Sequence, residues 1–353
     1  SLVDVLYEQA NGHARDELDK LGDPSLAYDV VLINLKENST NEYYTPLKDG
    51  DQSGQERAIT ERGYQGEYAV SVGVNINDKF YVGGSIGTQI IRYKYRGEYR
   101  ERIISTTSAL DNFSRVGVFE TNGSGVNFKI GAIFRPVHWL RLGLALHTPT
   151  YYTLSAYNES AFSSSFNTAP LPGGDFDGVK NFSNNNYSSY DYDLKTPWRF
   201  ITSIAAVLDK RLIISVDYEE VDHPASDLTD TYHGEYDEIR DFFKYNARAA
   251  SNIRLGTEYR ANSVLSLRAG YAYHGSPYAK GDWNEKNHLQ TLSAGLGFNW
   301  GGFYSDVAYL HKSATDTDYF YNYKTGNGEI LASNKIKTTL RSHEFRYSIG
   351  VRF

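Results

Sequence analysis

Cysteine and methionine are both absent from this chain of 353 residues, and no long hydrophobic run is present. The lack of cysteine excludes disulfide bonds, thiolate metal sites and a cysteine nucleophile. A transmembrane helix needs about 18 or more consecutive apolar residues, so none is predicted. A strand of a membrane β-barrel needs only about ten residues, half of them polar, and the sequence remains compatible with such strands.

Charge and motif patterns exclude further classes. The net charge is −7 and no basic cluster is apparent, so nucleic acid is not an expected partner. No glycine-rich phosphate loop precedes a predicted helix, and no second histidine lies at metal-ligand spacing from His147. We therefore predict no cofactor and no metal site. Because the chain opens at Ser1 without an initiator methionine, we expect further residues before it.

Aromatic residues are abundant, with 30 tyrosines and 17 phenylalanines, and the C-terminal segment shows how they are used. Phe345, Tyr347, Ile349, Val351 and Phe353 occupy every second position, with polar or small residues between them. A strand has a side-chain period of two, so this segment has one apolar and one polar face. Such a strand is typical of the closing strand of an outer-membrane barrel. We expect the barrel-assembly machinery to bind it through its end at Phe353.

The same alternation recurs in hairpins from Gly63 onward. Short turns near residues 78, 136, 209, 262 and 301 alternate with long connections rich in Ser, Asn, Asp, Gly and Tyr. Short turns on one side and long loops on the other are typical of outer-membrane barrels. We predict an all-β fold, an antiparallel transmembrane β-barrel over 62–353. Eleven strands are expected, at 62–76, 80–97, 120–135, 139–153, 190–207, 211–222, 248–260, 264–274, 288–300, 302–313 and 338–353.

Residues 1–61 have a different pattern and are predicted to form an extracellular loop region with short helices. Leu2, Val5 and Leu18 belong to apolar sets at helical spacing, and a second helical patch lies near 239–243. The simplest interpretation is that these helices cover the mouth of the barrel. The alternative is a lip that captures substrate.

Several segments resemble one family of outer-membrane proteins. They are Arg141–Pro149, Asn252–Tyr259 followed by Leu267–Tyr271, and Leu292–Gly297 leading to Val307–His311. Their order and spacing from Gly63 to Phe353 resemble the FadL-type transporters of hydrophobic substrates. Pro197-Trp198-Arg199 and Ser215–Tyr218 are similar to the branch found in Bacteroidetes-like bacteria.

The resemblance implies fourteen strands and an N-terminal hatch that plugs the lumen. It also implies an outer-membrane transporter that takes up hydrophobic or amphipathic small molecules, such as long-chain fatty acids, by passive diffusion. Substrate would enter at an outer groove and leave laterally after the hatch shifts. The sequence contains no recognisable hatch and no Asn-Pro-Ala segment, so we expect the hatch and three strands to precede Ser1.

Strand parity directs a set of charged side chains into the lumen. The candidate ligand-binding residues are Arg141, His147, Arg199, Arg254 and Arg268. We expect Arg199 near Asp217 or Glu219, and Arg268 near Arg254 or Glu258. One interpretation is a network of paired charges that braces the lumen. The other is that one or two arginines bind the carboxylate of an amphipathic ligand.

Two other functions fit a barrel. A hydrophilic diffusion porin would have an open, charged lumen. A hydrolase at the rim would need a base such as His147, His274 or His311, but no sequence context marks a serine nucleophile, so we predict no enzymatic activity. The expected partners are a hydrophobic small molecule and the lipid and lipopolysaccharide of the Gram-negative outer membrane.

Overall fold

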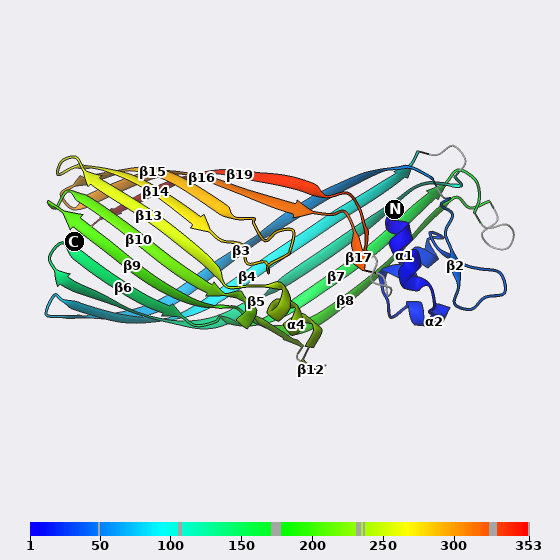
Figure 1. Cartoon of the computed structure of the whole chain (residues 1–353), viewed down its shortest axis with the longest axis horizontal. Coiled ribbons are helices and arrows are strands. Elements are labelled where there is room, and N and C mark those ends of the chain that lie inside the picture. The colour runs from blue at the N-terminus through cyan, green and yellow to red at the C-terminus, as the bar shows by residue number, and fades with distance from the viewer. Residues whose placement is uncertain are drawn as a thin grey trace.

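The computed structural model describes residues 1–48, 50–104, 108–170, 178–230, 234–235, 237–324 and 330–351. Within these residues a 15-stranded antiparallel sheet curls into an elongated barrel, with the N-terminal helices at one end and the C-terminus at the other (Figure 1). The predicted all-β barrel is thereby confirmed. None of the helices in the described ranges is long and apolar enough to cross a membrane.

Three long strands form one wall of the sheet: β3 (Ser53–Ile76), β4 (Phe80–Ile103) and β5 (Leu110–Val137). β3 begins nine residues before its predicted start at 62. The other strands of the sheet are β6 (Leu140–His147), β7 (Tyr151–Phe166), β8 (Asn181–Lys195), β9 (Trp198–Leu208), β10 (Leu212–Asp222), β11 (Asp227–Asp230), β12 (Gly234–Glu235), β13 (Ala250–Arg260), β14 (Leu265–His274), β15 (Leu289–Trp300), β16 (Phe303–Asp318) and β19 (Ile336–Val351).

The half of the sheet nearest the short turns has an apolar outward face. On β3 the side chains of Val70, Val72 and Val74 are all more than half exposed, while the residues between them face the lumen. Exposed β-branched residues in alternation suit a strand that meets lipid. Three residues connect β3 to β4, and positive φ angles at Asn77 and Asp78, with a hydrogen bond from the Lys79 N–H to the Ile76 carbonyl at 3.1 Å, match a type I′ turn.

Proline interrupts three neighbouring strands at one level. Pro149 separates β6 from β7, Pro197 separates β8 from β9, and Pro224 lies in the 3₁₀ helix η2 (His223–Ala225) between β10 and β11. Proline has no N–H to donate to a sheet ladder, so the pairing breaks there. The single strands predicted at 139–153 and 190–207 were therefore wrong in this respect. β5 stays unbroken and pairs with β6 below the break and with β7 above it.

Three short helices form a lobe at the outer end: α1 (Leu2–Ala10), α2 (Arg15–Leu18) and α3 (Asp23–Asp29). Ser1 and Asp4 form a capping box on α1, and Pro24 opens α3. Their apolar faces bury Leu6, Leu18 and Leu26 against aromatic residues of β4, β5 and β7, namely Tyr99, Phe113, Phe162 and Phe166. These strand residues lie on the lumen side, so the helices cover the mouth as predicted.

Two short pairs of strands lie at the same end. β1 (Asn34–Leu35) pairs with β2 (Tyr43–Tyr44), and β17 (Asn322–Lys324) pairs with β18 (Ile330–Ala332). The helix α4 (Asp237–Asn246) lies beside the proline break (Figure 1). Phe353, the expected end of the closing strand, lies outside the described residues.

The two edge strands of the sheet approach each other at the outer end. No strand pairing joins β3 to β19 within the described ranges. Arg57 on β3 instead forms an ion pair with Asp318 at the end of β16, and its guanidinium donates to the Tyr319 carbonyl at 2.9 Å.

The lobe has its own core, so it should be possible to destabilise it separately. Leu6 is 2% exposed and Leu21 is 39% exposed. We expect Leu6→Ala to destabilise the lobe by about 3 kcal/mol through lost burial and a residual cavity. Limited proteolysis should then cleave near the N-terminus faster, while the barrel keeps its resistance to heat in detergent gels. Leu21→Ala is the control, and equal protease sensitivity of the two variants would contradict the packing described here.

Candidate functional site

A cavity of about 700 Å³ lies against the wall formed by β3, β4, β5, β6 and β9, near the short turns. Glycine occupies neighbouring lumen-facing positions on four of these strands. They are Gly73, Gly83, Gly131 and Gly143. Ala145, Ser203 and Ala205 extend the same surface. Because these side chains are small or missing, the wall is hollowed on the lumen side.

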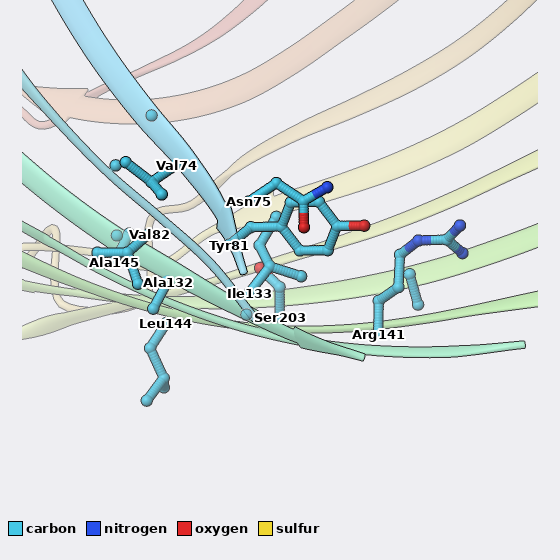
Figure 2. Close-up of a pocket in the computed structure, with 15 residues that line it drawn as sticks. Val74, Asn75, Tyr81, Val82, Ala132, Ile133, Arg141, Leu144, Ala145 and Ser203 are labelled. Carbon is cyan, nitrogen blue, oxygen red and sulfur yellow. The ribbon is translucent and has the colours of Figure 1, made fainter. Parts of the chain in front are cut away.

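Larger side chains border this cavity on the side of the short turns. Figure 2 shows Asn75, Tyr81, Ile133 and Arg141 on the lumen side of the strands, whereas Leu144 points the other way. Arg141 projects from β6, and its Nη1 atom is buried without a hydrogen-bond partner among the described residues. An unpaired guanidinium nitrogen beside a largely apolar cavity is a binding group for an anion.

A belt of charged side chains crosses the lumen above the cavity, level with the proline break. Lys129, His147 and Arg199 are cross-strand neighbours on β5, β6 and β9. Glu67 binds Lys129 at 2.6 Å on one side of this row. Glu219 lies 3.7 Å from Arg199 on the other.

Glu219 holds two arginines. Its side chain is only 3% exposed and pairs with both Arg199 and Arg254. The expected contact of Arg199 with Asp217 or Glu219 is thus confirmed for Glu219. Arg268 contacts Glu258 at 2.8 Å, as expected, and also pairs with Asp306 on β16. Arg199, Arg254 and Arg268 therefore belong to a network of paired charges, which is the bracing interpretation.

Arg141 and His147 are separate from that network. Neither has an ion-pair partner in the part of the chain that the structure describes. Of the histidines considered for a rim hydrolase, His147 and His311 lie on opposite faces of the sheet. His311 faces outward beside His343, with ring centroids 4.8 Å apart, whereas His147 lies in the lumen row.

An apolar patch lines the lumen side above the charged belt. Its core is Tyr152, Leu154, Ala156 and Tyr192, with Ile91, Phe119, Leu194 and Leu228 packed around them. Tyr152 also bonds to Gln89, and Gln65 bonds to both. From the lobe inward, the lumen surface therefore changes from apolar to charged and then to the small-residue cavity.

Residues 39–343 match the family described as outer membrane protein transport protein (OMPP1/FadL/TodX). The chain belongs to this family. It is accordingly an outer-membrane β-barrel of a family that transports hydrophobic compounds and is not an enzyme family. The match does not distinguish branches within the family. No curated protein matches the chain significantly.

One solved structure supports the fold. A FadL homologue of Pseudomonas aeruginosa aligns with a TM-score of 0.54 and 14% identity, covering 87% of this chain and 76% of that one. The Pseudomonas putida toluene transporter TodX aligns with a TM-score of 0.44 and 10% identity, covering 87% of this chain and 91% of TodX. At these identities the likeness concerns the fold alone.

Sequence reasoning missed part of this site. It did not single out Glu67 or Asp306, although strand parity puts both in the lumen. It also missed the glycines that line the cavity. The signal was available, since Gly73 and Gly83 fall at lumen positions of consecutive strands.

Glu219 allows a direct test of the bracing network. We expect Glu219→Gln to lower the free energy of unfolding by about 1–3 kcal/mol, because it leaves two guanidinium groups without their shared counter-ion. The partial exposure of both arginines keeps this below the figure for a fully buried pair. The measurement is the temperature at which the folded band disappears in a semi-native gel. Glu220→Gln, one residue away on the outward face, is the control and should melt like the unchanged protein.

Proposed function

We propose that this protein takes up amphipathic molecules with a long apolar chain and a carboxylate head, similar to long-chain fatty acids. The apolar patch around Tyr152 and Leu154 receives the chain beneath the lobe. The molecule then passes the charged belt and enters the small-residue cavity. There Arg141 binds the carboxylate. Diffusion down a concentration gradient drives the passage.

The main support for this proposal is that Arg141 has no carboxylate partner among the described residues. Of the four candidate arginines, Arg199, Arg254 and Arg268 have carboxylate partners, and Arg141 has none among the described residues. A partly buried guanidinium loses hydration that a bidentate carboxylate can replace. The neighbouring glycines leave room for an alkyl chain, since a Cβ added at Gly73 would approach nothing nearer than the Val82 carbonyl, at 3.9 Å.

A hydrophilic porin is the second candidate, and the charged belt is what favours it. The helices over the mouth argue against a wide aqueous path, because their core buries Leu6, Leu18 and Leu26 against the lumen side of the sheet. The two functions differ in conductance: a porin conducts ions steadily across a planar bilayer, and the proposed transporter does not.

Three narrower proposals go with this function. The first is that residues 1–61 lie outside the cell and 62–353 form the membrane barrel, supported by the position of the helices above the exposed apolar band. The second is that the assembly machinery binds β19, supported by its exposed row Phe345, Tyr347, Ile349 and Val351. The third is membership of a Bacteroidetes-like branch, supported by the Pro197-Trp198-Arg199 and Ser215–Tyr218 segments.

The role of Arg141 predicts a difference between two ligands of equal chain length. Arg141→Gln should weaken the binding of oleate by about tenfold or more, the worth of one charge-assisted pair. Binding of oleyl alcohol, which lacks the carboxylate, should stay within about twofold. Isothermal titration of the purified protein in detergent measures both. Arg211→Gln, an exposed arginine at a short turn, is the control. Equal loss for acid and alcohol would exclude the carboxylate contact.

The cavity itself can be filled without disturbing the backbone. We expect Gly73→Leu to abolish most uptake of oleate into proteoliposomes, because the new side chain occupies the space that the alkyl chain needs. Gly84→Leu on β4 is the matched control, since Gly84 faces outward and its added Cβ would meet only the Lys129 carbonyl, at 3.5 Å. Both variants should fold. Normal uptake by the Gly73 variant would show that the cavity is not on the path.

A further inference from the structure

The outward face of β4 is strongly basic beyond the lipid-facing band. Alternate residues on this strand point away from the lumen and are exposed, and one residue of β3 joins them. The group is Arg62, Arg92, Lys94, Arg96, Arg100 and Arg102. The expectation that the chain has no basic cluster was therefore wrong. The tyrosines at 93, 95 and 99 separate these residues in sequence, but the strand period collects them on one face.

The height of this basic face above the short turns follows from where the first outward charges occur on β3 and β4. The outward positions of β3 from Ile76 back to Tyr64 carry no charge, and the next one is Arg62. The outward positions of β4 from Phe80 to Ile90 carry no charge, and the next one is Arg92. Twelve steps from 76 to 64, at about 3.3 Å each and a tilt of about 40°, give a height of about 30 Å. That is close to the thickness of an apolar barrel band, so both arginines lie where the outer leaflet has its headgroups.

Counter-ions within the protein cover only part of this charge. Lys94 pairs with Glu120, and Arg96 pairs with Glu98 at 2.8 Å. Arg62 and Arg92 have no ion-pair or hydrogen-bond partner in the residues that the structure describes. Arg62 is the direct cross-strand neighbour of Lys94, and like charges in that position repel each other. An external anion between them would remove this repulsion.

Farther around the wall the outward face carries more acidic residues. Beyond the proline break, the outward side chains of β7 and β8 include Glu159, Asp191 and Asp193. Asp191 accepts a hydrogen bond from Ser155 and Asp193 from Thr153. Tyr64 and Tyr68, 60% and 74% exposed, flank the basic side at its lower edge, as tyrosine does at membrane interfaces.

We propose that Arg62 and Arg92 form a binding site for the phosphate groups of the outer-leaflet glycolipid, lipopolysaccharide. Guanidinium groups bind phosphate through paired N–H donors, and their attraction to a headgroup layer adds to that contact. Lys94, between the two, supports the same anion. The acyl chains of the lipid lie along the apolar band below, against Tyr68 and Val70. The site depends on the outer-membrane location of the barrel and not on the transported molecule.

The test compares two double variants that remove the same charge. Arg62→Gln with Arg92→Gln removes the proposed site. Lys210→Gln with Arg211→Gln removes two charges from a short turn at the opposite end. Binding of bisphosphorylated lipid A to the purified full chain is measured by native mass spectrometry in detergent. We expect the first variant to bind at least tenfold more weakly and the second to match the unchanged protein. Binding within twofold in both would overturn the proposal.

Further measurements distinguish a lipid ligand from a free anion and show whether the variant is folded. Millimolar inorganic phosphate should leave lipid A bound, and displacement by phosphate alone would show that the site serves a soluble anion. Monophosphorylated lipid A should bind more weakly than the bisphosphorylated form. Affinity of the unchanged protein for lipid A should fall as sodium chloride rises, and an affinity independent of salt would also overturn the proposal. Oleate binding by the Arg62/Arg92 variant should be unchanged.

Discussion

The continuity of the hydrogen-bond ladder is the constraint on which this structure depends. In hydrocarbon a backbone N–H or C=O has no water to bind, and the strands between the two edge strands β3 and β19 are accordingly paired with neighbours on both sides where they face lipid. The three prolines that break strands all lie at the outer end of the apolar band. At that level the Thr150 N–H donates to the Thr196 hydroxyl, and the Thr196 N–H donates to the Thr150 carbonyl. The sheet therefore divides where polar partners are again available.

The alternation that places apolar side chains against lipid also places the polar and charged side chains in the lumen. Because every second residue turns inward, the charges of five strands meet in one belt, and Glu219 can hold arginines from both its neighbours. Arg141 is too far down β6 to reach these carboxylates, and glycine or alanine occupies the nearby lumen positions. A paired network and an unpaired guanidinium thus follow from the placement of acids on the neighbouring strands.

The sequence was sufficient to predict the barrel, its turns and the pairing of Arg199 with Glu219, because a period of two determines both face and neighbour. It did not predict the division of the strands at Pro149 and Pro197. The position of one proline in the sequence does not show which other prolines lie at the same height in the sheet. That relation depends on register across β6, β7, β8 and β9. The packing of the lobe core could not be predicted from the sequence either, because residues such as Leu6 and Phe113 meet only through tertiary contacts. The basic face of β4 was hidden by its intervening tyrosines.

The proline break gives the two halves of the wall different connections to the lobe. β3, β4 and β5 run without interruption from the short turns to the lobe, where Tyr99 and Phe113 anchor the helices. β6, β9 and β10 end at the break. Continuous strands therefore connect the lobe to Gly73, Gly83 and Gly131, whereas β6, β9 and β10 connect to it only through their pairing with other strands. The cavity lies across this boundary, with Gly73, Gly83 and Gly131 on the continuous strands and Gly143 and Arg141 on β6.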